Sequence, residues 1–346
     1  MIELARGPDR RRQELFRETS RRMGVHEAII EKDFWVCLIL RILFSSERWG
    51  DKVVFKGGTS LSKVYRVIER FSEDIDLILD WRELGYSKDD PWLPESNAKK
   101  DQFAKTTTPM TRQFLNEVFT PSLQELCARE LGPILIIRAE EDIVKVEYPR
   151  AFANPSILPY IILEIGPLAA WTPHRAAVIT PYAAEHYPNI FSTPACPLRV
   201  VTAERSFWEK ATILHQEYHR PDNKQMPGRY SRHYYDVFKM TQSSIADSAL
   251  EQIDLLPRVV EFKERFYRAP WSNLCNARPG SFRVLPPDTR IPDLAHDYQS
   301  MSPMFFHEEP SFAAILESLR NLEMRINALR RLQMEKEGFR RAGTIP

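Results

Sequence analysis

Val53–Lys63, VVFKGGTSLSK, decides the fold of this chain when it is combined with Ser72–Leu79, SEDIDLIL. Val53–Phe55 predict a short buried strand, and the two glycines after it predict a sharp turn into a helix. In the second stretch apolar residues alternate with Asp74 and Asp76, which predicts a strand with both carboxylates on one face. The sequence therefore predicts a strand, a turn, a helix and an acidic strand in immediate succession.

The glycine turn has the composition of a phosphate-binding turn. Gly57 and Gly58 let the backbone approach a ligand closely, because no Cβ stands in the way. Thr59 or Ser60 is expected to cap the next helix, whose N-terminus suits a phosphate, and Lys63 adds a positive charge one turn later. The stretch has neither the Walker A order of residues nor the Gly-x-Gly-x-x-Gly of a dinucleotide fold.

The acidic strand suggests metal binding. Two aspartates two residues apart can share a pair of divalent cations about 3.5–4 Å apart, which would hold a triphosphate for in-line displacement. A simpler explanation is a plain strand-to-helix turn followed by a solvated acidic edge. That explanation covers each motif by itself, but not the occurrence of both around one helix between two apolar strands.

Composition and charge limit the class of protein. With 346 residues, 43% of them hydrophobic, the chain can build two domains. Lys and Arg number 48 against 47 Asp and Glu, so net charge favours neither nucleic acid nor membrane. The four cysteines lie far apart, and the apolar run Phe34–Leu40 is too short to span a bilayer. We therefore expect a soluble cytoplasmic protein without structural zinc or disulfides.

The periodicity along the chain predicts an α+β fold, with a small mixed sheet flanked by helices in residues 1–197 and a mainly α-helical domain in residues 198–346. Residues 10–46 are predicted to be helical with a break at Gly24, and Trp81 to Thr108 is predicted to be a surface excursion. The further predicted helices are Pro109–Leu131, Glu204–His219, Ser231–Met240, Ser248–Tyr267 and Ser311–Arg331, with an ordered wrap over 268–310. The further predicted strands are Ile134–Ile137, Ile143–Glu147 and Tyr160–Ile165.

These motifs resemble the nucleotidyltransferase superfamily of the DNA polymerase β type, whose signature is a Gly-Gly/Ser turn followed by Asp-x-Asp. More closely, Phe55–Lys63 with Phe71–Leu77 resembles the AbiEii/AbiGii toxin family, the toxin halves of abortive-infection (type IV) toxin–antitoxin systems. The resemblance implies a polymerase β-like domain that binds a nucleoside triphosphate with Mg²⁺ or Mn²⁺. It also implies that Asp74 and Asp76 are catalytic metal ligands.

The superfamily has a third carboxylate on a neighbouring strand. Glu164 is the preferred candidate, because a carboxylate within an otherwise apolar strand is costly unless it is paired or bound to metal. Glu147 is the alternative, on a strand where Lys145 suggests an exposed face.

Two later segments, Glu204–His215 and Arg229–Phe238, resemble later motifs of the AbiEii-like family. The resemblance implies that a Lys and an Asp of the helical domain, here Lys210 and Asp236, face the nucleotide pocket. Lys210 would neutralise the triphosphate and the charge of the transition state. Asp236 would orient Lys210 or Arg232, or help deprotonate the acceptor hydroxyl; Arg232 can also grip a phosphate.

Two other motifs receive different interpretations. His215 and His219 are spaced like a zincin pair, but Gln216 stands where the general-base glutamate belongs, so zinc hydrolysis is rejected. The stretch Glu31–Trp35 also recurs in the family; we expect a structural role for it, although Lys32 could reach the site.

The expected activity is a nucleotidyltransferase toxin (EC 2.7.7 type) that modifies RNA, especially the 3′ end of transfer RNA, in phage defence and is countered by a winged-helix antitoxin. RNA is favoured by the family resemblance, with the basic stretches Arg199–Arg232 and Arg320–Arg341 as candidate contacts or ordinary helix faces. The alternatives are nucleotidyl or phosphoryl transfer to a protein, and a nucleotide-binding module without turnover.

Overall fold

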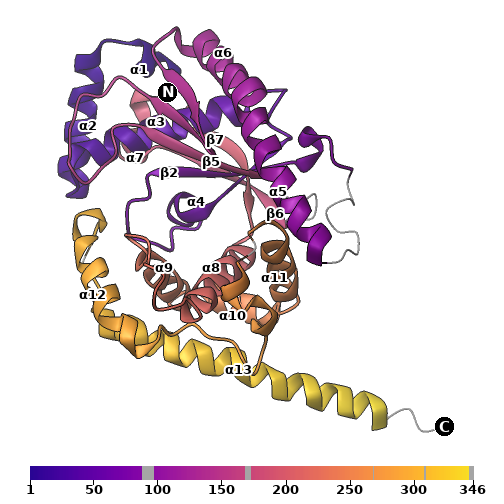
Figure 1. Cartoon of the computed structure of the whole chain (residues 1–346). Helices are drawn as coiled ribbons and strands as arrows, with labels where there is room; N and C mark the ends of the chain where they lie inside the picture. Colours follow the sequence, from indigo (N-terminus) through magenta and orange to yellow (C-terminus); the bar gives the residue numbers. More distant parts are fainter. Residues whose placement is uncertain (88–96, 168–172, 268, 308, 343–346) are drawn as a thin grey trace. The chain divides into compact units, whose positions relative to one another are not determined.

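The computed structural model describes residues 1–87, 97–167, 173–267, 269–307 and 309–342 (Figure 1). The chain divides into two compact units, of which the first contains Met1–Thr202 with Met304–His307 and the second contains Ala203–Pro303 with Glu308–Pro346. The division falls between Thr202 and Ala203, whereas the sequence placed a domain boundary after residue 197. None of the helices that the structure describes has the length and apolar composition needed to cross a membrane.

The first unit contains a seven-stranded mixed sheet of order β3-β4-β5-β2-β1-β7-β6. Two neighbouring pairs, β2 with β5 and β1 with β7, are parallel, and the others are antiparallel. The strands are β1 Val53–Lys56, β2 Asp74–Leu79, β3 Ile136–Glu140, β4 Ile143–Glu147, β5 Ile161–Pro167, β6 His174–Ile179 and β7 Cys196–Val201. The mixed sheet flanked by helices is confirmed, and the acidic strand β2 lies at its centre.

Two strands were missed by the sequence reading. β7 spans the domain boundary predicted after residue 197, where no strand was expected. It is the parallel neighbour of β1. β6 is an exposed edge strand without apolar alternation, so it carries little periodic signal. β3 begins two residues later than predicted, at Ile136.

The helices of the first unit pack against the sheet and against one another. They are α1 Ile2–Arg6, α2 Asp9–Met23, α3 Glu27–Phe44, α4 Gly57–Lys63, α5 Asn97–Phe114, α6 Thr120–Leu131 and α7 Tyr182–His186. Short helical turns add η1 Trp81–Leu84, the π-helical η3 Leu115–Phe119 and η4 Pro188–Ile190. The break near Gly24 is confirmed by its left-handed φ of 69°.

Two predicted helix limits were wrong. α4 ends at Lys63, although apolar residues continue at helical spacing as far as Ile68, and Arg66 takes a φ of 52°, outside the helical range. α5 begins at Asn97, within the predicted surface excursion, because Pro109 lies inside the helix rather than at its start. Residues 88–96 of that excursion lie outside the described residues.

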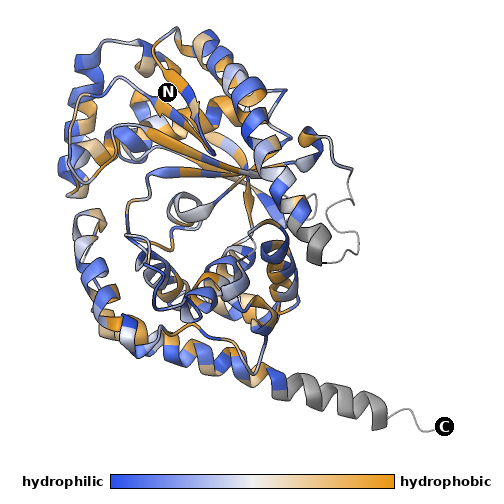
Figure 2. Ribbon diagram, viewed as in Figure 1, coloured by the Kyte–Doolittle hydropathy of each residue, from blue (hydrophilic) through white to orange (hydrophobic). Residues whose placement is uncertain are grey.

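α3 is the central helix of the first unit. Every residue from Ala28 to Leu40 is buried, and the helix packs against β7, α2 and α6. Figure 2 shows the apolar strands of the sheet, whose buried residues join α3 in one hydrophobic core. That core contains Phe55, Ile75 and Leu77, so the alternate residues of β1 and β2 face away from it.

The second unit is mainly helical, as predicted. Its helices are α8 Ala203–Tyr218, α9 Arg232–Thr241, α10 Ser244–Glu251, α11 Leu255–Phe266, α12 Ile291–Ser300 and α13 Phe312–Ala342. Short turns add η5 Pro270–Ser272, η6 Leu274–Asn276, η7 Asp288–Arg290 and η8 Ser302–Met304. The helix expected over Ser248–Tyr267 is two helices, and the wrap over 268–310 contains α12.

A late segment of the chain returns to the first unit. Phe71 donates its backbone N–H to the carbonyl of Met304 at 2.7 Å, and Phe306 donates to the carbonyl of Glu69 at 2.9 Å. Arg70 and Phe305 form an antiparallel bridge between these bonds. The loop that leads into β2 is therefore held by residues more than two hundred positions later in the sequence.

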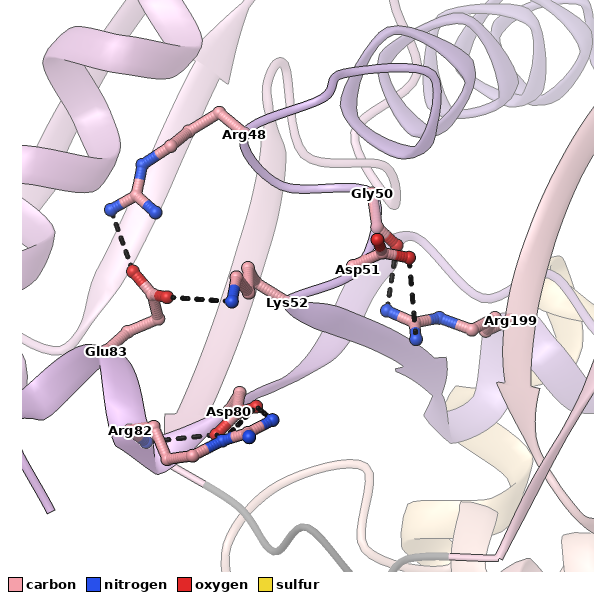
Figure 3. Close-up of polar contacts among 8 residues, drawn as sticks. All are labelled: Arg48, Gly50, Asp51, Lys52, Asp80, Arg82, Glu83 and Arg199. Carbon is pink, nitrogen blue, oxygen red and sulfur yellow. Dashed lines mark hydrogen bonds and ion pairs between the residues drawn. The ribbon is translucent and has the colours of Figure 1, made fainter. Parts of the chain in front are cut away.

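The end of the β1–β2 pair remote from the glycine turn has a cluster of ion pairs (Figure 3). Glu83 contacts Arg48 at 2.7 Å and Lys52 at 3.5 Å, and Asp80 pairs with Arg82. Nearby, Arg199 donates to the carbonyl of Gly50 at 2.8 Å and lies 3.9 Å from a carboxylate oxygen of Asp51. Each of these carboxylates has a cationic partner.

Candidate active site

The glycine turn brings the backbone against an aspartate of the neighbouring strand. Gly57, the first residue of α4, has a φ of 76°. A Cβ at this position would lie 1.9 Å from Oδ2 of Asp76. Gly57 is thus required both for its conformation and for the place of the Asp76 carboxylate. A Cβ at Gly58 would lie 2.6 Å from Oγ of Ser72, so the second glycine also touches the segment entering β2.

The carboxylates predicted for the site lie on one face of the sheet. Asp76 is the register partner of Lys56 on β1 and of Glu164 on β5, so these residues form one row across the strands. Asp74 is two residues from Asp76 and projects from the same face. Asp74 and Asp76 are partly buried, while Glu164 is exposed.

The electrostatics of Asp74 are unusual for a surface carboxylate. Burial, with the charges of Asp76 and Glu164 adding to it, raises the pKa of Asp74 from 3.8 to about 6. Its Oδ1 atom is buried and has no hydrogen-bond partner among the described residues. A buried acceptor without a donor, beside other carboxylates, fits a cation as its partner.

The carboxylates occupy neighbouring register positions, but they are not arranged as a complete metal site. Among the residues that the structure describes, no three His, Cys, Asp or Glu side chains are close enough together to hold a metal ion. Oxygen ligands of this kind suit Mg²⁺ and Mn²⁺.

Thr59 and Ser60 do not cap the helix, so this expectation was wrong. The N-cap residue of α4 is Lys56, without a side-chain cap bond. The hydroxyl of Thr59 donates to the carbonyl of Asp74 at 2.5 Å, and that of Ser60 donates to the carbonyl of Gly57 at 2.8 Å. Both side chains are buried; Thr59 ties the turn to the start of β2, and Ser60 bonds within the turn.

Lys63 has a partner within the protein. It is 6% exposed, and its ammonium lies 2.8 Å from Oδ1 of Asp33 and over the ring of Tyr182. Burial alone would lower the pKa of Lys63, but the charge of Asp33 and smaller contributions from other neighbouring groups together outweigh it, and the pKa is raised. These contacts oppose the expected phosphate contact, and we leave Lys63 out of the proposed site.

The two candidates for the third carboxylate have different neighbours. Glu164 is in register with Asp76, although it is exposed and not buried as the sequence argument assumed. Glu147 is also exposed, and its carboxylate lies 3.4 Å from Arg138 of β3. The register favours Glu164, and its role stays a prediction.

Lys56 is a candidate site residue that the sequence reading missed. It is partly buried, and its register places it directly beside Asp76. The signal was present in the alternation of β1, because Phe55 is buried in the core and Lys56 must then face the other side.

In the helical unit, α8 and α9 bring Lys210 and Asp236 together. Nζ of Lys210 lies 2.8 Å from Oδ2 of Asp236, which is fully buried, and 3.4 Å from Nδ1 of His233. Of the roles left open for Asp236, orienting Lys210 has direct support in this contact. Arg232 is the first residue of α9 and is partly exposed.

The histidine pair of α8 is used within the fold. His215 accepts the backbone N–H of Arg283 at Nδ1 and contacts the carbonyl of Asn273 through Nε2, each at 3.1 Å. Burial lowers the pKa of His215 to about 4, so the ring is neutral. With both nitrogens occupied, His215 cannot also bind zinc through them.

Several basic residues of Arg199–Arg232 also have partners in the fold. Arg205 pairs with Glu209 at 2.8 Å and Arg220 with Glu217 at 2.6 Å, while Arg199 donates to the carbonyls of Gly50 and Val53. The stretch is therefore not a uniformly available basic surface.

Comparison with known families identifies the chain. A sequence model described as nucleotidyl transferase AbiEii toxin, type IV toxin–antitoxin system, matches residues 38–318. The chain belongs to the AbiEii family. As an AbiEii-family protein it is an NTP-dependent nucleotidyltransferase and the toxin of a type IV toxin–antitoxin system, which implies an antitoxin partner.

Other comparisons are less informative. No curated protein sequence matches this AbiEii-family chain. Among solved structures, it is similar to the nucleotidyltransferase toxin MenT4 from Mycobacterium tuberculosis, with 15% sequence identity and a TM-score of 0.47. The match covers 90% of this chain and 89% of that chain.

Proposed function

We propose that this AbiEii-family toxin transfers nucleotide from a nucleoside triphosphate to an RNA acceptor, with Asp74 and Asp76 holding Mg²⁺ or Mn²⁺. The observation that supports this most directly is the partnerless, buried Oδ1 of Asp74 beside Asp76 and Glu164. Such a cluster is unfavourable without a cation, because like charges and burial both oppose ionisation. A bound divalent cation would supply charge neutralisation on the triphosphate and activation of the attacking oxygen.

Each residue of the proposed site would have a distinct role. Asp74 and Asp76 bind the cation, and Glu164, in register with Asp76, completes its surroundings. Gly57 leaves the space that the Asp76 carboxylate occupies. Lys56, beside Asp76 on β1, supplies a positive charge for phosphate oxygens. The backbone of Gly57 and Gly58 gives a ligand close access to the turn.

We assign Lys210 to neutralisation of the triphosphate, with Asp236 as the residue that orients it. The ion pair of 2.8 Å supports the second role, and the family resemblance supports the first. Arg232 remains a weaker candidate for a phosphate contact.

We propose RNA, specifically the 3′ end of transfer RNA, as the acceptor. The support is the resemblance to the AbiEii family, within which nucleotide addition to RNA would block translation and limit phage infection. A winged-helix antitoxin is the partner proposed on the same ground. Transfer to a protein is the competing acceptor hypothesis.

Labelled nucleoside triphosphates, incubated with the protein and with total RNA and polypeptide, test both the acceptor and the role of the metal-binding aspartates. The wild-type protein should label transfer RNA in the presence of Mg²⁺ or Mn²⁺ and lose activity in EDTA. Asp76→Ala should lose at least about 1,000-fold in rate and no longer inhibit growth, with an unchanged circular dichroism spectrum. Glu140→Ala is the matched control, because it removes an exposed carboxylate of the same sheet, on β3, that has no proposed role in the site.

The outcomes separate the hypotheses. Label confined to polypeptide would refute the RNA acceptor but keep the site. Full activity and toxicity of Asp76→Ala would refute the site. Tight triphosphate binding by calorimetry without any labelled product would favour the binding module. A larger loss in Glu147→Ala than in Glu164→Ala would reverse the choice of third carboxylate.

A further inference from the structure

Helix α3 has three consecutive charged residues that are all buried. Glu31, Lys32 and Asp33 are 2%, 0% and 4% exposed. Successive helix residues point about 100° apart, so these side chains reach different neighbours. A buried charge is costly unless it is paired and hydrogen-bonded. The partners of these residues are therefore informative, and two of them belong to segments that form the carboxylate site.

Lys32 is bound to the residue that precedes Asp74. Its ammonium lies 2.9 Å from Oε2 of Glu73 and 3.2 Å from the carbonyl oxygen of Leu158. The same carboxylate oxygen of Glu73 accepts the backbone N–H of Leu158 at 2.9 Å. Lys32 thus joins α3, the entry of β2 and the segment before β5 at one buried point.

Asp33 is bound to the other half of the site. Oδ1 of Asp33 lies 2.8 Å from the ammonium of Lys63, the last residue of α4, and Oδ2 accepts the backbone N–H of Tyr182 at 2.6 Å. The ammonium of Lys63 also lies 3.5 Å from the centre of the Tyr182 ring. The helix that begins at Gly57 is therefore anchored at its far end to α3.

We propose that Lys32 and Asp33 are positioning residues for nucleotidyl transfer, which hold the start of β2 and helix α4 at a fixed separation through Glu73 and Lys63. This inference rests on the proposed role of Asp74 and Asp76. The separation matters because Gly57 and Asp76 are already so close that an added Cβ would overlap the carboxylate. A shift of about 1 Å in such a site costs on the order of 100-fold in rate.

Stability alone does not account for these pairs. Replacing a buried ion pair by well-packed apolar groups is often neutral or stabilising, because desolvation of the two charges offsets their attraction. The adjacent carboxylates also repel one another, so β2 needs a fixed anchor before a cation is bound. Two pairs from consecutive residues in the buried part of α3 provide that anchor from the core side.

The test uses two charge-neutral double variants, K32M/E73Q and D33N/K63M. Each removes one positive and one negative charge, so the net local charge is unchanged. The amide oxygens introduced by E73Q and D33N can still accept the N–H groups of Leu158 and Tyr182. Glu31→Gln is the matched control. Glu31 is an equally buried carboxylate on the same helix, but it accepts the backbone N–H groups of Ala151 and Phe152.

Three quantities are measured for each variant: the melting temperature, kcat and KM for the triphosphate, and Mn²⁺ binding without nucleotide by electron paramagnetic resonance. We expect both double variants to melt within a few degrees of wild type. Their kcat should fall about 30- to 100-fold with KM nearly unchanged, and Mn²⁺ affinity should fall about 10-fold. Glu31→Gln should stay within about threefold on both functional measures.

The positioning role is refuted if a folded double variant matches Glu31→Gln in kcat and Mn²⁺ affinity. A purely structural role predicts that result, with the loss confined to melting temperature. If one double variant does not fold, the other decides. If wild-type protein transfers no nucleotide at all, the proposed function fails, and Mn²⁺ affinity still compares the variants.

Discussion

The aspartates at the two ends of the β1–β2 pair have pKa values shifted in opposite directions. At the glycine end, Asp74 lies among other carboxylates and its pKa is raised to about 6 by burial and by the charges of Asp76 and Glu164. At the other end, burial would raise the pKa of Asp80, but hydrogen bonds and charge from Arg82 outweigh it and the pKa is lowered. Asp74 is the first residue of β2, and Asp80 directly follows its last residue.

This difference is what we expect if the glycine end is the proposed active site and the other end serves the fold. The chain places arginine and lysine beside the acids where they serve the fold, as Figure 3 shows for Asp80 and Glu83. Around Asp74 burial is the largest cause of the shift, and the charges of Asp76 and Glu164 dominate over that of Lys32, so the net effect of its surroundings is to raise the pKa. A cluster that lowers the stability of the folded chain is expected where an external cation is to bind.

Among the variants that compare the two ends of the β1–β2 pair, Gly57→Ala should have the largest effect. The new methyl group would overlap Oδ2 of Asp76, and the φ of 76° disfavours any Cβ, so we expect at least a 100-fold loss of nucleotidyl transfer. Gly85→Ala at the other end is the control, because Gly85 has a φ of 86° but nothing within 4 Å of an added Cβ. It should lower the melting temperature without lowering kcat. Equal activity losses in both variants would contradict the comparison.

A smaller effect, with a defined sign, is expected for Asp74→Asn in EDTA. Since the folded-state pKa of about 6 exceeds the ordinary 3.8, the contribution of this group to stability is full below about pH 4 and is lost as pH rises through 6. Asp74→Asn should therefore raise the melting temperature at pH 7.5 by roughly 2–5 °C. The gain should vanish near pH 4.

Asp80→Asn should behave in the opposite way. The lowered pKa of Asp80 gives stability that is present above its unfolded pKa and is lost as pH falls through the folded value. The variant should melt below wild type at neutral pH, and the two should converge in acid. Thermal scans from pH 3 to 8 measure both substitutions, and the same sign for both would undermine the contrast.

The smallest effect is expected for Arg48→Ala. Its ion pair with Glu83 is 2.7 Å long, but Arg48 is 48% exposed and Glu83 keeps Lys52 as a second partner. An exposed pair of this kind contributes less than about 1 kcal/mol to the free energy of unfolding. Urea titration should show that change, reduced further in high salt, with wild-type kcat. A loss of activity would mean that this cluster also serves the reaction.

Local patterns were sufficient for the centre of the sheet. The alternation around Asp74 and Asp76 located β2 and its faces, and the glycines after Phe55 located the turn. The register of Glu164 with Asp76 agrees with its choice as the nearest third carboxylate, although the burial argument behind that choice was wrong. The catalytic roles of these residues stay predictions.

Contacts between residues far apart in the sequence could not be predicted from local sequence patterns. Lys63 has the spacing of a phosphate ligand, but its partner Asp33 is thirty residues earlier, on a helix whose apolar composition hides three buried charges. Thr59 and Ser60 have cap-forming side chains, yet their hydroxyls bond to nearby backbone carbonyls. β7 pairs with β1, which lies about 140 residues earlier in the chain. The local sequence carries no sign of this pairing, and a domain boundary was predicted within the strand instead.

The return of Met304–Phe306 to the loop before β2 sets an order of events during synthesis. A ribosome adding about 5–20 residues per second needs tens of seconds to pass from residue 71 to residue 306. During that time the loop that enters β2 lacks its pairing segment, and until Val201 emerges β1 also lacks its parallel neighbour. The loop that enters β2 therefore reaches its final pairing only after Met304–Phe306 have been synthesised.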